Sequence, residues 1–288
     1  MSIFVNIAAY RDPELPATIR SVINNSTHDL HISIVEQCTR RERFDQSPFV
    51  SDRVTISRQW MLPKDARGPV YARKLALQNY AGEDYYLQID SHTDLIQNWD
   101  EKMIAALNLA CEIEKSSRVI LSAYPAAYKL NGSNRHRIPY HPKYVATPQK
   151  VKPKVGRRGE LAAGRVDKET DLPELSTTLL AGYIFGPGDF TKVHYDDNIA
   201  FWGEEFNLAI RAWMDGWRIY SPHEMYVWHH YQRRGMDMIW NDHPLWNDIY
   251  RQSIEYQMKY YASLRGGSLH EDHINTIQEW TEYWKRHT

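Results

Sequence analysis

The stretch Tyr85-Tyr86-Leu87-Gln88-Ile89-Asp90-Ser91-His92 decides how the rest of the chain is interpreted. Its first five residues are mostly apolar or aromatic, which predicts a buried β-strand. Asp90 and His92 follow two positions apart where the strand ends, so both side chains point to the same side and can share one divalent cation. Polar turn residues also end ordinary strands, so the pair alone only suggests a metal that holds phosphate groups.

Strands and helices alternate on both sides of this stretch. Apolar runs predict strands at residues 3–9, 31–35, 54–56, 85–89, 119–123, 179–185, 217–220 and 225–228. Helical spacing of apolar residues predicts helices that begin near Asp12, Arg67, Asn98 and Trp202. Asp12 is expected to cap the first of these, Asn98 to start a capping box, and the helix after Arg67 to turn Tyr71, Leu75 and Leu77 inward. The alternation predicts an α/β fold with an open, mostly parallel sheet flanked by helices.

The chain of 288 residues is expected to form one large domain over residues 1–234. Residues 235–288 are rich in aromatic side chains and helical in pattern, which predicts a C-terminal helical extension packed on the same domain. Within the first domain, residues 131–165 contain nine Lys or Arg and four Pro but one acid, Glu160. This composition predicts a basic loop region over about residues 131–175.

The overall composition excludes several classes of protein. A formal net charge of -1 does not call for nucleic acid or an anionic membrane as a partner. No segment approaches the roughly 18 apolar residues of a membrane span, and the N-terminus does not resemble a secretory signal. Cys38 and Cys111 lack a motif spacing, which favours two thiols in a reducing compartment. We therefore expect a soluble, cytoplasmic protein without a membrane partner.

A third candidate metal ligand follows the strand predicted at residues 225–228. His229 ends this strand, whereas the adjacent His230 points to the opposite side, so at most one of them faces Asp90. Two ligands from one strand end and a third from another would leave coordination positions open for a diphosphate. Such mixed nitrogen and oxygen ligands suit Mn²⁺ better than Ca²⁺.

Two further motifs have both a functional and a structural interpretation. Arg67 and Arg73 lie on the helix that precedes the Asp90 strand, where they either contact an anionic donor or form a solvated face. The motif Trp202-Gly203-Glu204-Glu205 combines a stacking ring, a glycine that admits a ligand and two acids, although acids are also good residues for a helix start. The sequence lacks the glycine-rich dinucleotide motif, the P-loop, the nucleophile elbow and the H-E-x-x-H zinc motif.

Four segments in this order resemble the GT-A glycosyltransferases that glycosylate polypeptides. They are RGPVYARKLALQNYAGEDYYLQIDSHTDLIQNWDEKMI (67–104), LLAGYIFGPGDF (179–190), FWGEEFNLAIRAW (201–213) and YVWHHYQR (226–233). The wording of QIDSHTDLIQNWDEKMI is most similar to the cytoplasmic N-acetylglucosaminyltransferases that modify hydroxyproline on a ubiquitin-ligase adaptor. Mucin-type polypeptide N-acetylgalactosaminyltransferases are more distant relatives. The resemblance spans about residues 3 to 234.

The resemblance implies a role for each matching residue. The implied metal ligands are Asp90, His92 and His229, with His230 structural or facing the acceptor. The implied nucleotide-sugar contacts are Ala9, Tyr10, Arg11, Glu36, Arg67, Arg73, Asp90, Ser91 and Gly182. The implied residues of the catalytic pocket are Trp202, Glu204 and Glu205. Glu204 departs from the glycine of the mucin-type relatives, so their sugar preference does not transfer to this chain.

The implied reaction moves a sugar, N-acetylglucosamine or glucose, from a UDP-sugar to an acceptor hydroxyl with retention of configuration. Mn²⁺ or Mg²⁺ would stabilise the departing UDP, and Glu205 would position the sugar or acceptor. The favoured acceptor is a hydroxylated protein side chain, with glycans as another option. The alternatives are hydroxylated bases in DNA and a non-catalytic module that binds sugar nucleotides or proteins. The DNA alternative would use basic residues within 131–165, namely Arg135, Arg137, Lys150, Lys152, Lys154, Arg157 and Arg158.

Overall fold

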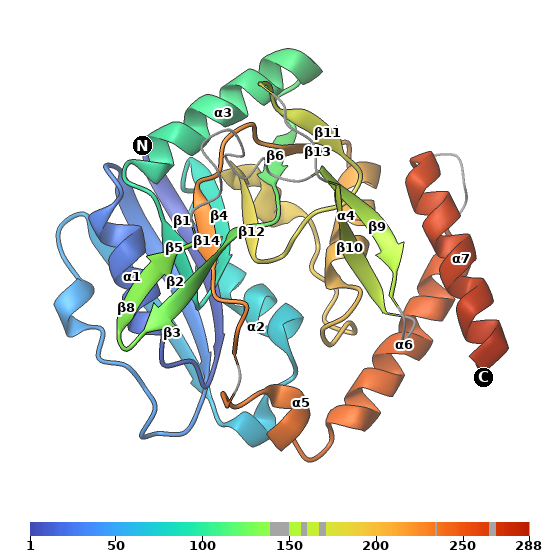
Figure 1. Cartoon of the computed structure of the whole chain (residues 1–288), viewed down its shortest axis with the longest axis horizontal. Coiled ribbons are helices and arrows are strands. Elements are labelled where there is room, and N and C mark those ends of the chain that lie inside the picture. The colour runs from blue at the N-terminus through green and yellow to red at the C-terminus, as the bar shows by residue number, and fades with distance from the viewer. Residues whose placement is uncertain (139–149, 157–159, 167–170, 234, 265–268, 288) are drawn as a thin grey trace.

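An eight-stranded sheet forms the centre of the molecule (Figure 1). The computed structural model describes residues 1–138, 150–156, 160–166, 171–233, 235–264 and 269–287. The strand order is β11-β13-β6-β12-β4-β1-β2-β3. The bounds are β1 Ser2–Tyr10, β2 Asp29–Gln37, β3 Val54–Met61, β4 Tyr85–Asp90, β6 Val119–Ser122, β11 Glu174–Ser176, β12 Tyr183–Pro187 and β13 Arg218–Ser221. Neighbouring strands pair in parallel except where β12 meets β4 and β6 and where β11 meets β13.

Helices cover both faces of this sheet, as the sequence predicted. The helices on these faces are α1 Leu15–Asn24, α2 Pro69–Ala76, α3 Trp99–Glu114 and α4 Glu204–Met214. The C-terminal part adds α5 Ile239–Asp242, α6 Trp246–Ser263 and α7 Glu271–His287. Alternate residues of one strand point into two separate cores. Val5 of β1 packs in the core that contains residues of α1 and α3, whereas the adjacent Phe4 packs with residues of α2 and α4.

A smaller sheet crosses the ends of the large one and includes strands far apart in sequence. Its order is β5-β14-β7-β8, with β5 Thr93–Leu95, β7 Ala126–Asn131, β8 Asn134–Arg137 and β14 Val227–His229. β14 pairs antiparallel with β5, which places His229 opposite Thr93. This pairing brings the end of β14 beside the turn that follows β4.

The segment for which the sequence predicted a basic loop contains three complete strands in its described part. Besides β8, the strands β9 Lys150–Val155 and β10 Leu161–Val166 form an antiparallel ribbon that contacts α7 and α4. Prolines and a high density of charge hid the alternation that identifies a strand. Residues 139–149, 157–159 and 167–170 of this segment lie outside the described residues.

The expectations about helix ends and faces were only partly correct. Asp12 precedes α1 and its Oδ1 accepts a hydrogen bond from the N–H of Glu14 over 3.0 Å, but the helix begins at Leu15 with Glu14 at the N-cap position, and Oδ2 of Asp12 contacts Ser91 and His92. Asn98 does precede α3, but its side chain makes no capping hydrogen bond. Helix α2 fully buries Val70, Ala72, Arg73 and Ala76, while Tyr71, Leu75 and Leu77 are only partly covered.

The C-terminal helices pack against α4 and the ribbon. Phe206 and Ile210 of α4, Leu161 of β10, Ile254 and Tyr261 of α6, and Trp280 of α7 form one apolar cluster. Among the helices that the structure describes, none combines the length and apolar character needed to cross a bilayer.

Candidate active site

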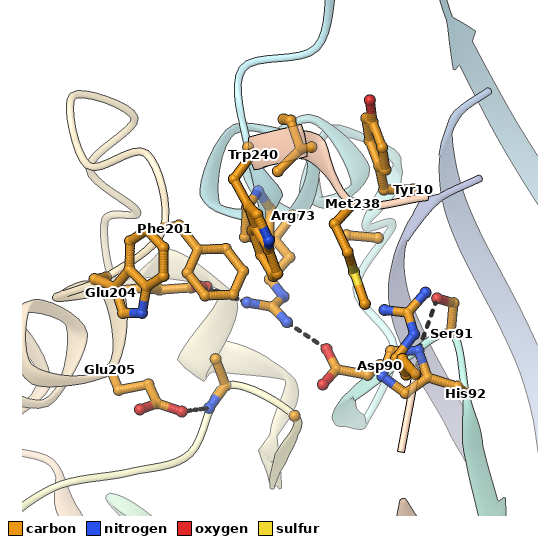
Figure 2. Close-up of a pocket in the computed structure, with 18 of the residues that line it drawn as sticks. Tyr10, Arg73, Asp90, Ser91, His92, Phe201, Glu204, Glu205, Met238 and Trp240 are labelled. Carbon is orange, nitrogen blue, oxygen red and sulfur yellow. Dashed lines mark hydrogen bonds and ion pairs between the residues drawn. The ribbon is translucent and has the colours of Figure 1, made fainter. Parts of the chain in front are cut away.

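A cavity of about 540 Å³ opens at the carboxyl ends of the parallel strands β1, β2 and β4. Ligand sites of open α/β sheets lie at this edge, because loops rather than helices surround the strand ends. Its walls come from the start of α2, the turn before α4 and the segment from His229 to Trp240. Figure 2 shows Asp90, Ser91 and His92 on one side of the pocket and Phe201, Glu204 and Glu205 on the other.

Asp90, His92 and His229 meet at the floor of this cavity. One potential ligand atom from each lies within 4.8 Å of the others. Asp90 ends β4, His92 lies in the next turn, and His229 is brought alongside by the pairing of β14 with β5. The two imidazole rings contact each other edge to face, with centroids 4.4 Å apart.

The chemistry of these three side chains fits a divalent cation. Nδ1 of His92 lies 2.7 Å from a carboxylate oxygen of Asp12, which leaves Nε2 for a metal. Nε2 of His229 lies 3.1 Å from Oδ2 of Asp90, and two ligand atoms at right angles around one small ion are about 3 Å apart. Nδ1 of His229 is buried without a hydrogen-bond partner among the described residues. Two imidazole nitrogens and one carboxylate oxygen in this arrangement are a ligand set that suits Mn²⁺.

The ionisation of these groups also suits metal binding. Burial, together with the nearby His92, lowers the pKa of His229 to about 4, so its imidazole is neutral near pH 7. Burial opposes the ionisation of Asp90, but the hydrogen bond to His229 and the charge of Arg73 hold the pKa of this carboxyl well below its usual range. A neutral imidazole and an ionised carboxylate are the forms that bind a metal.

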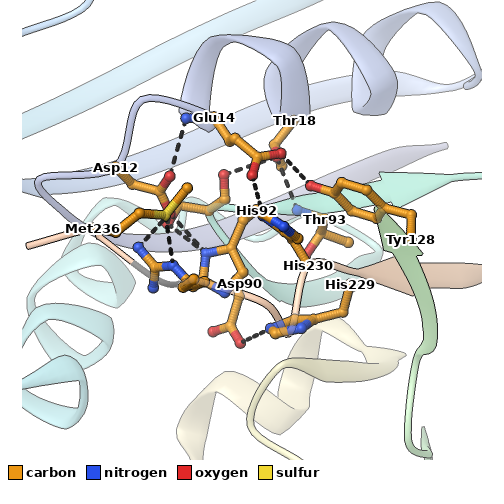
Figure 3. A network of polar contacts seen from close by, with 12 residues as sticks. Asp12, Glu14, Thr18, Asp90, His92, Thr93, Tyr128, His229, His230 and Met236 are labelled. Atoms are coloured by element: carbon orange, nitrogen blue, oxygen red, sulfur yellow. Dashed lines mark hydrogen bonds and ion pairs between the residues drawn. The ribbon is translucent and has the colours of Figure 1, made fainter. Parts of the chain in front are cut away.

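His230 has a separate position. Its Nδ1 lies 2.5 Å from a carboxylate oxygen of Glu14, and its ring stacks on Tyr128. Figure 3 shows Asp12 near His92 and Glu14 near His230, so the short turn before α1 provides a carboxylate for each histidine. Of the two adjacent histidines, His229 therefore belongs to the triad of potential metal ligands and His230 to a buried polar network.

Arg73 is enclosed by carboxylates of the protein. Its guanidinium donates to Asp90 over 2.6 Å and to Glu204 over 2.5 Å, and only 4% of the residue is exposed. Helix α2 makes this possible because it turns the Arg73 face toward the sheet. Burial raises the pKa of Glu204 even though Arg73 opposes the shift. The arginine that we expected at the diphosphate thus fixes Asp90 and Glu204 in position.

The turn before α4 forms the opposite wall. Oε1 of Glu205 accepts a hydrogen bond from the N–H of Ala181 over 3.1 Å (Figure 2). Burial raises the pKa of Glu205 to about 8, although this N–H opposes the shift. Gly182 faces Asp90 so closely that an added Cβ would lie 2.7 Å from Oδ2, so only glycine fits there without displacing the carboxylate.

Most of the residues suggested by the sequence line this one cavity. They are Tyr10, Arg73, Asp90, Ser91, His92, Gly182, Trp202, Glu204, Glu205 and His229. Four others lie outside its lining. Ala9 points into the core, Glu36 pairs with Arg58, Arg11 pairs with Glu42, Asp237 and Asp242, and Arg67 stacks on Tyr71 at the surface.

Sequence reasoning missed several residues at the cavity. Asp12 was interpreted only as a helix cap, although its position after the first strand was a signal that it could reach the end of a neighbouring strand. Arg233 lines the cavity and lies 3.3 Å from the Asp12 carboxylate. Met238 and Trp240 reach the cavity from a segment whose sequence shows no recognisable motif.

The chain is similar in sequence to one family of glycosyltransferases and in fold to solved glycosyltransferase structures. A family model described as glycosyltransferase (GlcNAc) matches residues 2–59 and 38–282. A sequence search of curated proteins returns no match. Among solved structures, the fold is similar to that of GalNAc-T7 with UDP, GalNAc and Mn²⁺, with a TM-score of 0.61 and 17% identity. That similarity covers 100% of this chain and 54% of the other, so the chain spans about half the length of that protein.

A second similar structure is that of Staphylococcus aureus TarS, residues 1–349, in complex with UDP-GlcNAc. Its TM-score is 0.55 at 14% identity, and the similarity covers 100% of this chain and 72% of that one. At these identities the similarity concerns the fold, which is the GT-A glycosyltransferase fold that the sequence predicted.

Proposed function

The chain belongs to the glycosyltransferase (GlcNAc) family, and from this premise we propose that it transfers a sugar from a UDP-sugar to an acceptor hydroxyl with the help of a divalent cation. The observation that supports this most strongly is the triad of Asp90, His92 and His229 on the floor of the cavity. Both similar structures contained a UDP nucleotide, and the GalNAc-T7 structure also contained Mn²⁺.

The proposed metal is Mn²⁺ or Mg²⁺, held by Asp90, His92 and His229. When bound, it would supply Lewis-acid stabilisation of the charge that develops on the departing UDP. Asp12 keeps His92 in the tautomer that presents Nε2, and Arg73 keeps Asp90 oriented. Tyr10 and Ser91 line the end of the cavity where the resemblance puts the nucleoside. In this proposal four residues outside the cavity lining contribute indirectly, by stabilising the segments to which they belong. They are Ala9, Arg11, Glu36 and Arg67.

The sugar would occupy the region between Gly182 and the turn from Trp202 to Glu205. Glu204, Glu205 and Asp90 line this region, and the charge of Arg73 is already shared between two of them. A sugar with its own carboxylate would find no unpaired cation among these side chains, so we propose a neutral hexose or N-acetylhexosamine. The description of the family and the ligand of the TarS structure favour N-acetylglucosamine, with glucose as the alternative.

We further propose that transfer retains the anomeric configuration. Glu205 is anchored to the N–H of Ala181, and its raised pKa favours the protonated form, which is a poor nucleophile. Glu205 would therefore hold a hydroxyl of the sugar or acceptor, while the acceptor attacks from the face that UDP leaves. An NMR assignment of the anomeric proton in the product tests this step, and an inverted product would contradict it.

For the acceptor we propose a hydroxyl on a protein side chain, as the resemblance to the hydroxyproline-modifying enzymes implies. The DNA alternative has less support, because Arg135 and Arg137 are engaged with Glu14 and Asp94 of the protein itself. The side chains of Lys150, Lys152 and Lys154 and the whole of Arg157 and Arg158 lie outside the described part of the chain. We also propose a cytoplasmic location, since Cys38 and Cys111 lack the spacing of a disulfide framework or a metal motif.

The decisive experiment is hydrolysis or transfer measured with Mn²⁺ across UDP-glucose, UDP-N-acetylglucosamine and UDP-galactose. Activity should depend on the metal and should be lost in Asp90→Ala and His229→Ala. If both variants kept full metal-dependent transfer, the metal assignment would be wrong. Inactivity with every nucleotide sugar would support the alternative of a non-catalytic binding module.

A further inference from the structure

Two buried polar side chains of α6 contact the turn that precedes α4. Ser253 and Gln257 lie one helical turn apart and are each 1% exposed. Oγ of Ser253 accepts a hydrogen bond from the N–H of Ala200 over 3.1 Å. Nε2 of Gln257 donates to the carbonyl oxygen of Trp202 over 3.1 Å. Both contacts are made to backbone, so they fix the path of the turn itself.

The contact between Gln257 and the turn is tight enough to require a glycine. Gly203 has a φ of 95°, and a Cβ added there would lie 2.0 Å from Oε1 of Gln257. One turn before Ser253, the ring of Tyr250 packs edge to face on Trp202, with centroids 4.9 Å apart. Three residues on one face of α6 therefore hold the segment from Ala200 to Gly203.

Packing alone does not account for these polar contacts. α6 is already joined to α4 through Ile254 and Tyr261, which lie in the apolar cluster with Phe206 and Ile210. Burying Gln257 is costly, since its Oε1 has no hydrogen-bond partner among the described residues. We therefore attribute Gln257 to positioning the backbone of Trp202 rather than to apolar stabilisation of the fold.

We infer that α6 is a component of the sugar end of the cavity, and that Ser253 and Gln257 are positioning residues for Trp202, Glu204 and Glu205. This inference rests on the proposed UDP-sugar donor. These three side chains and Gly182 line the same cavity, in the region where the sugar would bind. The metal triad and the residues at the nucleoside end of the cavity lie on other elements. Ser253 and Gln257 do not fix the position of those elements.

The test is the affinity for UDP and for UDP-N-acetylglucosamine, measured by calorimetry on the full chain with Mn²⁺. The variant is Gln257→Leu, which keeps a side chain of similar size but removes the amide. Its matched control is Gln252→Leu on the same helix, where the native glutamine is exposed. We expect Gln257→Leu to bind UDP-N-acetylglucosamine at least about fivefold more weakly with unchanged UDP affinity, which corresponds to about 1 kcal/mol. The control should change neither affinity.

Equal losses for UDP and UDP-N-acetylglucosamine, or no loss for either, would overturn the inference. A second variant, Ser253→Ala, removes the other contact and is subject to the same two outcomes if Gln257→Leu does not fold.

A wild-type protein that binds neither nucleotide would contradict the proposed donor instead. In that case hydrogen exchange in the ligand-free protein still tests the positioning role. Backbone exchange over residues 200–206 should quicken in Gln257→Leu and Ser253→Ala and stay unchanged in Gln252→Leu, and unchanged exchange in both α6 variants would refute it.

Discussion

At the scale of single residues, the turn before α1 contains two carboxylates that serve two histidines in parallel. Asp12 accepts from the ring of His92, and Glu14 lies against the ring of His230. Only the first of these imidazoles belongs to the triad of potential metal ligands. The two pairs have the same chemistry, so they form a natural comparison between a potential metal ligand and a structural histidine.

Asp12→Asn should weaken Mn²⁺ binding by about 10- to 100-fold, because an amide does not hold His92 in the required tautomer. Glu14→Gln makes the equivalent change beside His230 and should leave Mn²⁺ affinity within about twofold of the wild type. Titration calorimetry with Mn²⁺ measures both. A larger effect for Glu14→Gln than for Asp12→Asn would mean that His230, not His229, completes the site.

The raised pKa of Glu205 predicts a pH-dependent difference in stability. Its pKa is 4.5 in an unperturbed glutamate and about 8 in the folded protein, so between these values the folded state binds more protons than the unfolded state. Stability contributed by this group is therefore greatest below about pH 4.5 and is lost as pH rises through about 8. Glu205→Gln imitates the protonated form and does not titrate.

The melting temperature of Glu205→Gln relative to wild type should accordingly rise from pH 5 to pH 8 and level off above that. Differential scanning fluorimetry across this range measures the difference. Glu279→Gln, which removes an exposed glutamate of α7, is the control for the loss of one carboxylate. A constant offset between Glu205→Gln and wild type at every pH would show that Glu205 is ionised throughout.

At the scale of elements, the sequence predicted those strands and helices whose own pattern is strong. The strand that ends at Asp90 and the helix that contains Trp99 are long apolar or amphipathic segments that bury most of one face, so local pattern and tertiary structure agree. β5 and β14 are three residues long, and their pairing depends on the whole fold. For that reason the sequence offered His229 as a ligand but gave no physical basis for placing it beside His92.

The inward face of α2 shows how a functional site overrides local pattern. Apolar spacing favoured the face with Tyr71, Leu75 and Leu77, yet the helix buries Arg73 because Asp90 and Glu204 neutralise its charge. Both partners come from elements that sequence periodicity cannot place next to α2. A buried ion-pair network of this kind is visible only once the elements are assembled.

The hairpin of β7 and β8 provides a further test at this scale. Arg135 pairs with the buried Glu14, donates to the carbonyl of Thr93 over 2.7 Å and lies over the ring of Tyr128. Arg135→Met should lower the free energy of unfolding by about 2 kcal/mol, since it leaves these groups with fewer partners. Arg137→Met on the same strand removes a more exposed pair with Asp94 and should cost less than about 1 kcal/mol.

Urea denaturation of the two variants measures these differences. Binding to duplex DNA at low salt should be unchanged in Arg135→Met, because this guanidinium is directed toward the protein. A large loss of DNA affinity in that variant, with little loss of stability, would instead support the DNA alternative.

At the scale of the whole molecule, the site depends on contributions from almost the full length of the chain. Asp12 lies near its start, Asp90 at the centre of the sheet, Glu205 at the start of α4 and Gln257 within α6. The α/β class and the GT-A fold were predictable, because they follow from the alternation of elements and the order of a few motifs. The contribution of α6 was not, because a buried glutamine in a helix has no signature before its partner is known.

The shared guanidinium of Arg73 has a consequence for the order in which ligands enter. Among the described residues that line the cavity, the only arginines are Arg73 and Arg233, and each is already paired with carboxylates of the protein. A free diphosphate would therefore meet a surface with no unopposed positive charge. UDP should bind at least about 100-fold more weakly in EDTA than in Mn²⁺, and equal affinities would contradict this. Initial-rate kinetics should then follow a compulsory sequence, in which the cation precedes the nucleotide or arrives with it.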